Sequence, residues 1–528
     1  MINKFILSLL VVYGMSACDT TELQDLNIDP QSVNEIDLNF LFTHALLTTA
    51  SGGPNDNRYI DWRTNMGYCS TLLQQMASIG SITRGGDIYT YNFETHDAPW
   101  EFGYGAVLKQ TSNILEQTGE GGYAAGENLN LRQAARILQA FTFHRLTDYY
   151  GNIPYSESLQ GKAGVFLPAF QSQQSIYADL IKELTEAGAA ISASNPDEGF
   201  AFADIYFDGD IAKWKKFAAS LRLRLAMRQS NVDASEVAGA VSAAASGGMM
   251  TNADNIFIQM AIGPSEWTNQ NGISRAYYPG DGGNESFLSK TMIDFLKGTD
   301  PNTTADDDPR LMIFSGGIAD WTAAAWTPKN VNPLEQEGLP NGSDNSDFPD
   351  LTVNLFSRLN FLLLQDDDPY QIMNAAETHF LLAEAYERGL ATGNAQAEYE
   401  AGVRLAMTMY DVFDPSLART DAQVDDYLAA YPYGGGGVGG GQSRLEQIGQ
   451  QMWASKFMNW FDAWADWRRT GFPVLVPTAH PSSLTPGVIP RKLRIPTHEV
   501  ATNGVNVTAG ATQPHQDETT RVWWDGGS

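Results

Sequence analysis

Residues 376–410 read AETHFLLAEAYERGLATGNAQAEYEAGVRLAMTMY, and this stretch decides the fold class. Apolar side chains recur through both halves at the spacing of a buried stripe along an α-helix. Gly389 and Gly393 stand between the halves, and glycine is typical of the turn after a helix. The stretch therefore predicts two consecutive helices joined by a short link. The apolar positions are Ala376, Phe380, Ala383 and Leu390, then Tyr399, Val403, Ala406 and Tyr410.

The same spacing appears in two earlier segments. One of them begins directly after Asp210, whose carboxylate can accept hydrogen bonds from the first free amides of a helix. Successive helices with short links are typical of tetratricopeptide-like arrays, although no clean consensus repeat is present. We therefore predict a mostly α fold of tetratricopeptide-like helix pairs. The periodic positions are Ile176, Leu180, Leu184, Ala187 and Ile191, then Ile211, Trp214, Ala218, Leu221 and Leu225.

Long stretches without helical spacing separate these segments. Residues 252–287 and 299–358 are rich in Gly, Asn, Asp and Pro, and residues 431–442 are rich in glycine. Loops of this length are uncommon in a compact domain unless they carry function. Since no segment reads as a linker between two cores, residues 38–528 are predicted to form a single helical domain with ligand-binding loops.

The first eighteen residues have the form of an export signal. Lys4 precedes an apolar stretch too short to span a bilayer, and small residues lead up to Cys18. This arrangement resembles a bacterial lipobox, whose cysteine is lipidated; the alternative is an ordinary signal peptide with a chance cysteine. We expect residues 1–17 to be a lipoprotein signal peptide and residues 18–37 a lipid-anchored tether. The other cysteine, Cys69, is predicted to be a small buried apolar side chain.

Acidic residues dominate the charge of the chain. Its 528 residues include 62 Asp and Glu against 33 Lys and Arg, a formal net charge of −29. Binding to nucleic acid or to anionic lipid requires a basic surface, so the sequence argues against both, and membrane attachment would be through the N-terminal lipid alone. The same charge disfavours sulfated or uronate polymers as ligands and favours neutral ones.

Motifs for catalysis are absent from the sequence. Glycoside hydrolysis requires two carboxylates at a set separation, and no motif places such a pair. The seven histidines form no paired metal-binding motif, and neither a nucleophile elbow nor a phosphate-binding loop occurs. The acidic runs at 306–308 and 366–368 are interpreted as solvated or helix-capping loops, with a calcium site as the alternative. We predict a binding protein without catalytic residues, cofactor or metal.

Seven short blocks follow in order along the chain. Three of them are LTDYYGNIPYSE at residues 146–157, GDIAKWKKFA at residues 209–218 and DWRRTGFP at residues 466–473. The others lie at residues 27–30, 308–311, 380–385 and 489–496. Together, and behind a lipobox, they resemble the SusD/RagB family of surface glycan-binding lipoproteins of Bacteroidetes.

This resemblance implies a fold, a location and a partner. Family members are outer-membrane lipoproteins with a SusD-like α superhelical fold, and they act as a lid over a SusC-like TonB-dependent transporter barrel. They often bind sugar through aromatic side chains of an N-terminal segment and a mid-chain loop. The resemblance supports those two regions without identifying single residues, because the loops do not align by eye.

Aromatic side chains in polar loops are the candidates for sugar binding. The C–H face of a sugar packs on a ring, while amides and carboxylates bind its hydroxyls. The aromatic residues from Trp453 to Trp467 have helical spacing and are assigned to the core. For each loop ring the alternative is packing beneath its loop. The first cluster is Trp267, Asn269, Asn271, Tyr277, Tyr278 and Asp281; the second is Tyr89, Tyr91 and Asn92; a third is Trp321; and Trp62 could approach the site.

These inferences combine into one expected function. The chain is predicted to be a cell-surface lipoprotein that captures a neutral oligosaccharide or polysaccharide, such as a glucan or fructan. It would then deliver the glycan to a SusC-like TonB-dependent transporter. Two alternatives stay open: a peptide-binding lipoprotein of the same family, and a helical-repeat scaffold that binds no small ligand.

Overall fold

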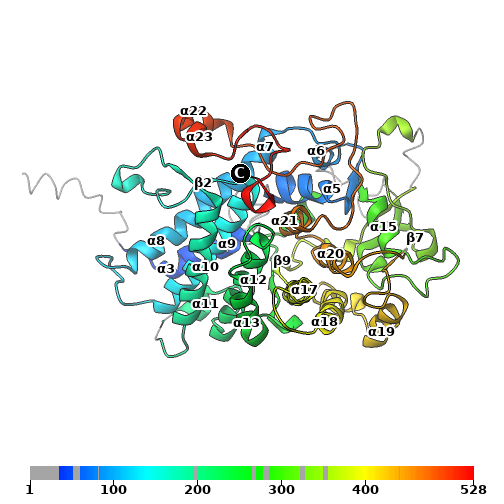
Figure 1. The fold of residues 1–528 in the computed structure, drawn as a ribbon, viewed down its shortest axis with the longest axis horizontal. Coiled ribbons are helices and arrows are strands. Elements are labelled where there is room, and N and C mark those ends of the chain that lie inside the picture. Colours follow the sequence, from blue (N-terminus) through cyan, green and yellow to red (C-terminus); the bar gives the residue numbers. More distant parts are fainter. Residues whose placement is uncertain are drawn as a thin grey trace, which may run out of the picture.

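Pairs of packed helices form much of the molecule (Figure 1). Helix α9 (Leu129–Tyr150) packs on α10 (Gln173–Ala190), α12 (Ile211–Gln229) on α13 (Val237–Gly247), and α17 (Ala375–Glu387) on α18 (Ala395–Thr408). In Figure 1 these helices follow one another from α9, in cyan, to α18, in yellow. The predicted mostly α fold with helix pairs is confirmed.

The computed structural model describes residues 35–50, 60–80, 82–195, 197, 199–263, 269–277, 285–320, 327–348, 355–438 and 440–527. The predicted signal peptide, most of the predicted tether and Cys18 lie outside these residues. Further helices are α3 (Leu38–Thr49), α7 (Phe93–Phe102), α8 (Lys109–Gln117), α11 (Phe200–Ala203), α14 (Gly272–Tyr277), α15 (Lys290–Leu296), α19 (Asp421–Ala430), α20 (Arg444–Ser455), α21 (Trp460–Thr470), α22 (Thr497–Thr502) and α23 (Gly504–Gly510). Among the described residues, none of the helices has the length and apolar character needed to span a membrane.

Local sequence explains where the helices begin. Asp210 accepts hydrogen bonds from the backbone N–H groups of Ala212 and Lys213, as the sequence predicts for the start of α12. Asn374 caps α17 in the same way by accepting from the N–H of Glu377 at 3.0 Å. The short link of residues 388–394, which contains both glycines of the quoted stretch, then returns the chain to α18.

Helices α17 and α18 approach closely at Gly402. A Cβ atom at this position would lie 2.7 Å from the ring of Phe380, which is fully buried. We expect Gly402→Val to lower the free energy of unfolding by about 1 to 3 kcal/mol, the usual cost of overpacking a core. Gly105→Val is the matched control, since a Cβ there meets no atom within 4 Å. Urea denaturation of both variants tests this, and equal stabilities would contradict a tight contact at Gly402.

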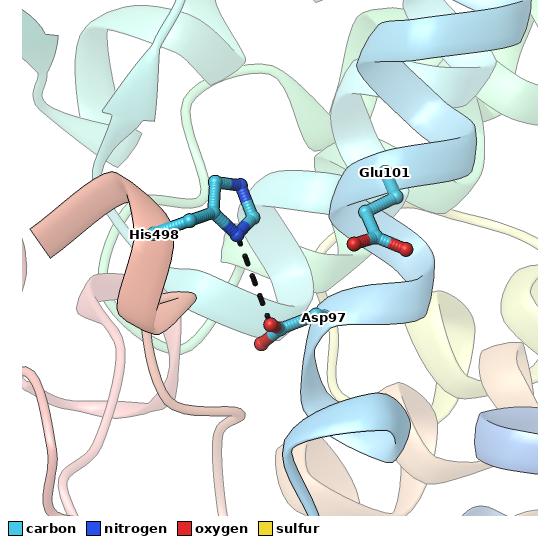
Figure 2. A group of neighbouring side chains, drawn as sticks. All are labelled: Asp97, Glu101 and His498. Atoms are coloured by element: carbon cyan, nitrogen blue, oxygen red, sulfur yellow. Dashed lines mark ion pairs between the residues drawn. The ribbon is translucent and has the colours of Figure 1, made fainter. Parts of the chain in front are cut away.

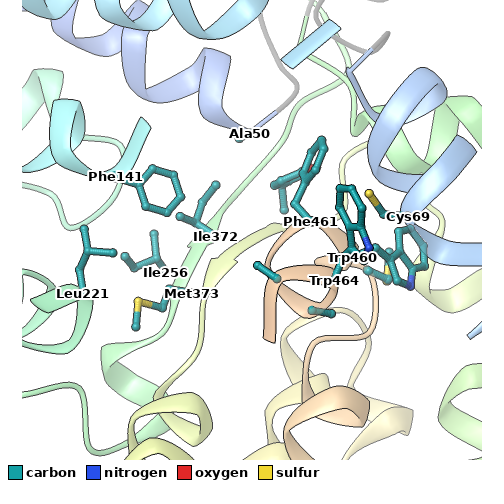
Figure 3. Packing of buried hydrophobic residues seen from close by; sticks show 14 of the residues in the cluster. Ala50, Cys69, Phe141, Leu221, Ile256, Ile372, Met373, Trp460, Phe461 and Trp464 are labelled. Carbon is teal, nitrogen blue, oxygen red and sulfur yellow. The ribbon is translucent and has the colours of Figure 1, made fainter. Parts of the chain in front are cut away.

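The aromatic stripe of residues 453–467 is buried, and its assignment to the core is confirmed. It belongs to two helices rather than one, because the chain breaks between α20 and α21. At the break, Met458 has a φ of 75°, which an α-helix does not allow. Figure 3 shows Trp460 and Trp464 of α21 beside Cys69, which is buried as predicted.

A buried ion cluster joins four of the helices. Arg224 of α12 donates two hydrogen bonds of 2.6 Å to Glu377 of α17 and one of 3.0 Å to Asp462 of α21. Asp462 also accepts two hydrogen bonds of 3.1 Å from Arg145 of α9. Because its members lie on different helices, the cluster ties the helix pairs to one another. Its other members are Asp148, Arg228, Lys456 and Asp466.

Short strands bring the long loops together. Strand β1 (Met76–Ser78) pairs antiparallel with β5 (Ser286–Leu288). Strand β6 (Ser315–Asp320) pairs antiparallel with β7 (Thr327–Asn330) and with β8 (Ser357–Leu359), and β5 contacts β8. The other described pairs are β2 (Ile153–Pro154) with β3 (Phe170–Gln171) and β4 (Ile256–Ile258) with β9 (Tyr370–Met373). The stretches 252–287 and 299–358 are thus partly ordered by strands rather than wholly irregular.

Candidate functional site

One segment of the first predicted cluster and the segment of the third are attached to the same group of strands. The segment with Tyr278 and Asp281 joins Tyr277 to Glu285, at the start of β5. The segment with Trp321 joins Asp320 of β6 to Thr327 of β7, and these two residues face each other across the sheet. Since β5 contacts β8 and β8 pairs with β6, the attachment points of both segments lie in one region. We call the group β1, β5, β6, β7 and β8 the loop platform.

Tyr277 links two strands of the loop platform, β5 and β8, through hydrogen bonds of its hydroxyl. Its side chain is buried, its hydroxyl donates to the carbonyl of Ser286 at 2.9 Å, and the N–H of Leu359 donates to that hydroxyl. Burial raises the pKa of Tyr277 to about 12, so the hydroxyl stays protonated and can donate. The prediction that this ring lies in the open as a sugar platform is wrong, because the ring is buried and its hydroxyl bonds to β5 and β8.

Asn271 and Asn269 are members of the first cluster whose side chains bond to neighbouring backbone. Asn271 is buried, accepts hydrogen bonds from the N–H groups of Ile273 and Ser274 at the start of α14, and donates to the carbonyl of Asp368. The prediction of Asn271 as an exposed ligand contact is wrong, because its side chain is buried and caps α14. Asn269 is half-buried, and its amide donates to the carbonyl of Gly263 at 3.1 Å.

The second cluster is divided between interior and surface. Tyr89 is buried, and its hydroxyl accepts a hydrogen bond of 3.0 Å from the N–H of Thr478, so its ring has no free face and the prediction of an exposed ring is wrong. Tyr91 is half-buried, with the guanidinium of Arg494 4.4 Å from its ring centre. Asn92 is exposed and caps α7. Trp62 is half-buried on the π-helix of residues 61–69.

The remaining predicted residues lie outside the described residues. They are Trp267, Tyr278, Asp281 and Trp321. Their roles in ligand binding stay predictions. The described residues that flank them lie next to the loop platform or next to Asn269 and Asn271.

A polar cavity of about 660 Å³ adjoins the loop platform. One wall comes from Gln74, next to β1, and from Lys290, Thr291 and Asp294 of α15, which follows β5 directly. The other walls are residues 340–344 and 476–481. Its volume is in the range of small-molecule sites, and its amides, hydroxyls and prolines offer hydrogen bonds beside small apolar surfaces.

Arg84 fixes the walls of this cavity relative to one another. Its guanidinium donates to the carbonyl of Ser78 in β1 at 2.6 Å, and to the carbonyl of Ser343 and the carboxylate of Asp344 on the opposite wall. The imidazole of His480, in the third wall, lies 3.1 Å from Asp344. These contacts hold segments from three distant parts of the sequence in one arrangement.

Asp87 also bonds to the cavity wall formed by residues 340–344. Its carboxylate is fully buried and accepts hydrogen bonds from the amide of Asn341 at 2.6 Å and from the N–H of Gly342 at 2.8 Å. Burial raises the pKa of Asp87 to about 7, and these hydrogen bonds only partly oppose the rise. The folded protein therefore binds a proton here that the unfolded chain does not bind between about pH 4 and pH 7.

We expect this proton to make the wild-type protein more stable, relative to Asp87→Asn, as the pH falls. A carboxyl group whose pKa is higher in the folded than in the unfolded protein stabilises the fold when it is protonated. This stabilisation grows as the pH falls and levels off near the pKa of the unfolded state. Between pH 8 and pH 5 the difference in free energy of unfolding should change by about 2 to 3 kcal/mol in favour of the wild type. Denaturant titrations at both pH values measure it. An equal difference between the two proteins at pH 8 and at pH 5 would show that Asp87 is ionised in the folded state.

Sequence reasoning missed the cavity walls. Residues 476–481 contain Pro477, His480 and Pro481, and this proline-rich pattern is the one signal that marks an ordered, non-helical segment. Nothing in the sequence places that segment against Arg84 and Asp344, which come from other parts of the chain.

Comparison with known proteins gives a consistent result. A family model, SusD-like, described as starch-binding associating with outer membrane, matches residues 30–496. A solved structure of a chitin-binding protein is similar with a TM-score of 0.78 and 28% identity, covering 93% of this chain and 100% of that chain. A Bacteroidetes SusD-like structure gives 0.77 at 24% identity over 93% and 100%. A chitin-binding SusD homologue from Flavobacterium johnsoniae gives 0.71 at 23% over 92% and 98%. None of the curated proteins matches the sequence.

Proposed function

The chain belongs to the SusD-like family of starch-binding proteins that associate with the outer membrane, and from this premise we propose that it binds a neutral glycan at the cell surface. It then delivers the glycan to a SusC-like TonB-dependent transporter. The observation that carries the proposal is that the segments with Tyr278 and Trp321 are attached to one platform beside a polar cavity. The protein acts by binding and release, without chemistry on the glycan.

Chitin oligosaccharides are the first ligands to test. A protein of 28% identity that aligns over 93% of this chain carries the description chitin-binding. Chitin is an uncharged polymer, which suits a protein with a net charge of −29. Its acetamido groups donate and accept hydrogen bonds, and the Asn, Gln and Thr side chains of the cavity can reciprocate both.

Calorimetric titration of the purified protein with a ligand panel tests the proposal. The panel contains chitin oligosaccharides, a glucan, a fructan, a uronate polymer and mixed peptides. We expect binding of at least one neutral glycan and none of the uronate polymer. Binding of peptides without glycans would favour the peptide-binding alternative, and absence of any binding would favour a scaffold.

The partner and the anchor require a separate test. Cys18 would hold the protein to the outer membrane through a lipid, and the transporter would lie beneath it. Gentle solubilisation of membranes should therefore release the protein together with a large outer-membrane barrel. Recovery without a barrel would contradict the delivery step but not the binding of glycan. Release of the Cys18→Ser variant as a soluble protein would support the anchor.

A further inference from the structure

Three side chains that could bind a metal ion meet at the junction of α7 and α22. Asp97 and Glu101 lie one turn apart on α7, so that their carboxylates project from the same face. His498 comes from α22, and its Nδ1 atom lies 3.8 Å from a carboxylate oxygen of Asp97. Figure 2 shows the three side chains converging, and one ligand atom from each lies within 4.8 Å of the others.

Asp97 is the unusual member of this group. It is only 5% exposed, and among the described residues its Oδ1 atom has no hydrogen-bond partner. A buried carboxylate oxygen without a hydrogen bond is costly, because it has lost its hydration without compensation. Burial raises the pKa of Asp97, and the charge of nearby Glu101 adds to the rise while His498 opposes it. The negative charges of Asp97 and Glu101 therefore lie close together, and a cation bound between them would neutralise them.

We propose that Asp97, Glu101 and His498 form a binding site for a divalent transition-metal ion, with zinc as the best match. One imidazole nitrogen and two carboxylate oxygens are a ligand set typical of zinc, whereas calcium and magnesium prefer oxygen alone. Water would complete the coordination. Ligands on a tetrahedral zinc ion lie about 3.3 Å apart, given metal–ligand distances of about 2.0 to 2.2 Å.

Small side-chain rotations close the site. Glu101 and His498 are both exposed, so each can turn toward Asp97 without disturbing the core. Asp97 is fixed by its burial and would act as the constant ligand. The ion would hold α22, and α23 after it, against α7, joining segments about 400 residues apart in the sequence, which Figure 1 draws in red and in blue. This inference is independent of the proposed glycan binding.

Calorimetric titration of the metal-free full chain with zinc alone tests the site. We expect one equivalent of zinc to bind, and the affinity to fall at least tenfold in His498→Ala and in Glu101→Gln. Both residues are exposed, so neither change endangers folding. His515→Ala is the matched control, because it removes another histidine of the C-terminal region, a half-buried one outside the site, and should bind zinc as the wild type does. Zinc should also raise the melting temperature of the wild type but not that of His498→Ala.

Three results would overturn the proposal. They are absence of stoichiometric zinc binding, equal affinity in the wild type and His498→Ala, and displacement of zinc by an equal concentration of calcium. The last would show that oxygen ligands alone hold the ion. Cobalt gives an independent reading, because its visible spectrum in the wild type should show nitrogen and oxygen ligands and should change in His498→Ala.

Discussion

We expect Arg224→Met to lower the free energy of unfolding by about 3 to 5 kcal/mol, the usual cost of removing one partner of a buried ion pair. The guanidinium of Arg224 is fully buried between Glu377 and Asp462. Burial alone would raise the pKa of Asp462, but Arg145 and Arg224 hold it well below its usual range. Without Arg224 both carboxylates lose a counterion in the interior. Methionine keeps much of the volume, so the measured loss reports on charge.

Arg404→Met is the matched control for this prediction. Arg404 of α18 also bonds to two carboxylates, those of Asp421 and Asp425, but its side chain is 37% exposed. Water screens such pairs, so the expected loss is below about 1 kcal/mol. Urea denaturation followed by circular dichroism compares the two variants. Similar small losses in both would mean that the buried ion cluster contributes no net stability.

The helices could be predicted from the sequence because their evidence is local. The apolar positions of α10, α12, α17 and α18 repeat at a spacing that only a helix buries on one face. The buried ion cluster could not be predicted in the same way. In sequence, Arg224 and Glu377 look like members of a solvated helix face, and their pairing appears only when α12 meets α17. The break at Met458 is likewise hidden, since the aromatic spacing continues through it.

The sequence could not show which of the candidate aromatic side chains are buried. An aromatic side chain in a polar loop has the same sequence context whether it packs under the loop or lies on it. Both Tyr277 and Tyr89 bond to a segment distant in the sequence, which is Leu359 for Tyr277 and Thr478 for Tyr89. The cavity walls depend on contacts between parts of the chain hundreds of residues apart, which composition and spacing do not reveal.

The second large effect concerns Trp267, and it rests on the proposed glycan binding. We expect Trp267→Ala to weaken binding of the best glycan by about tenfold to a hundredfold, or about 1.4 to 2.8 kcal/mol, as for an aromatic hot spot. Asn269 holds together the two ends of the segment that carries Trp267. Its backbone carbonyl accepts a hydrogen bond from the N–H of Ala261 at 2.8 Å, and its side-chain amide donates to the carbonyl of Gly263. Because these hydrogen bonds join the two ends of the segment, less conformational entropy is lost when its ring binds a sugar face.

Phe202→Ala is the control that separates this effect from a general loss of aromatic surface. Phe202 is 89% exposed on α11, which lies at the opposite end of the molecule from α15 and β7 in Figure 1. Its removal should leave glycan affinity unchanged in calorimetry, whereas Trp267→Phe should keep part of the affinity because a ring face remains. If Trp267→Ala binds glycan as tightly as Phe202→Ala does, the segment with Trp267 is outside the site. Tyr278, Trp321 and the cavity walls around Asn341 and His480 would then remain as the candidate contacts.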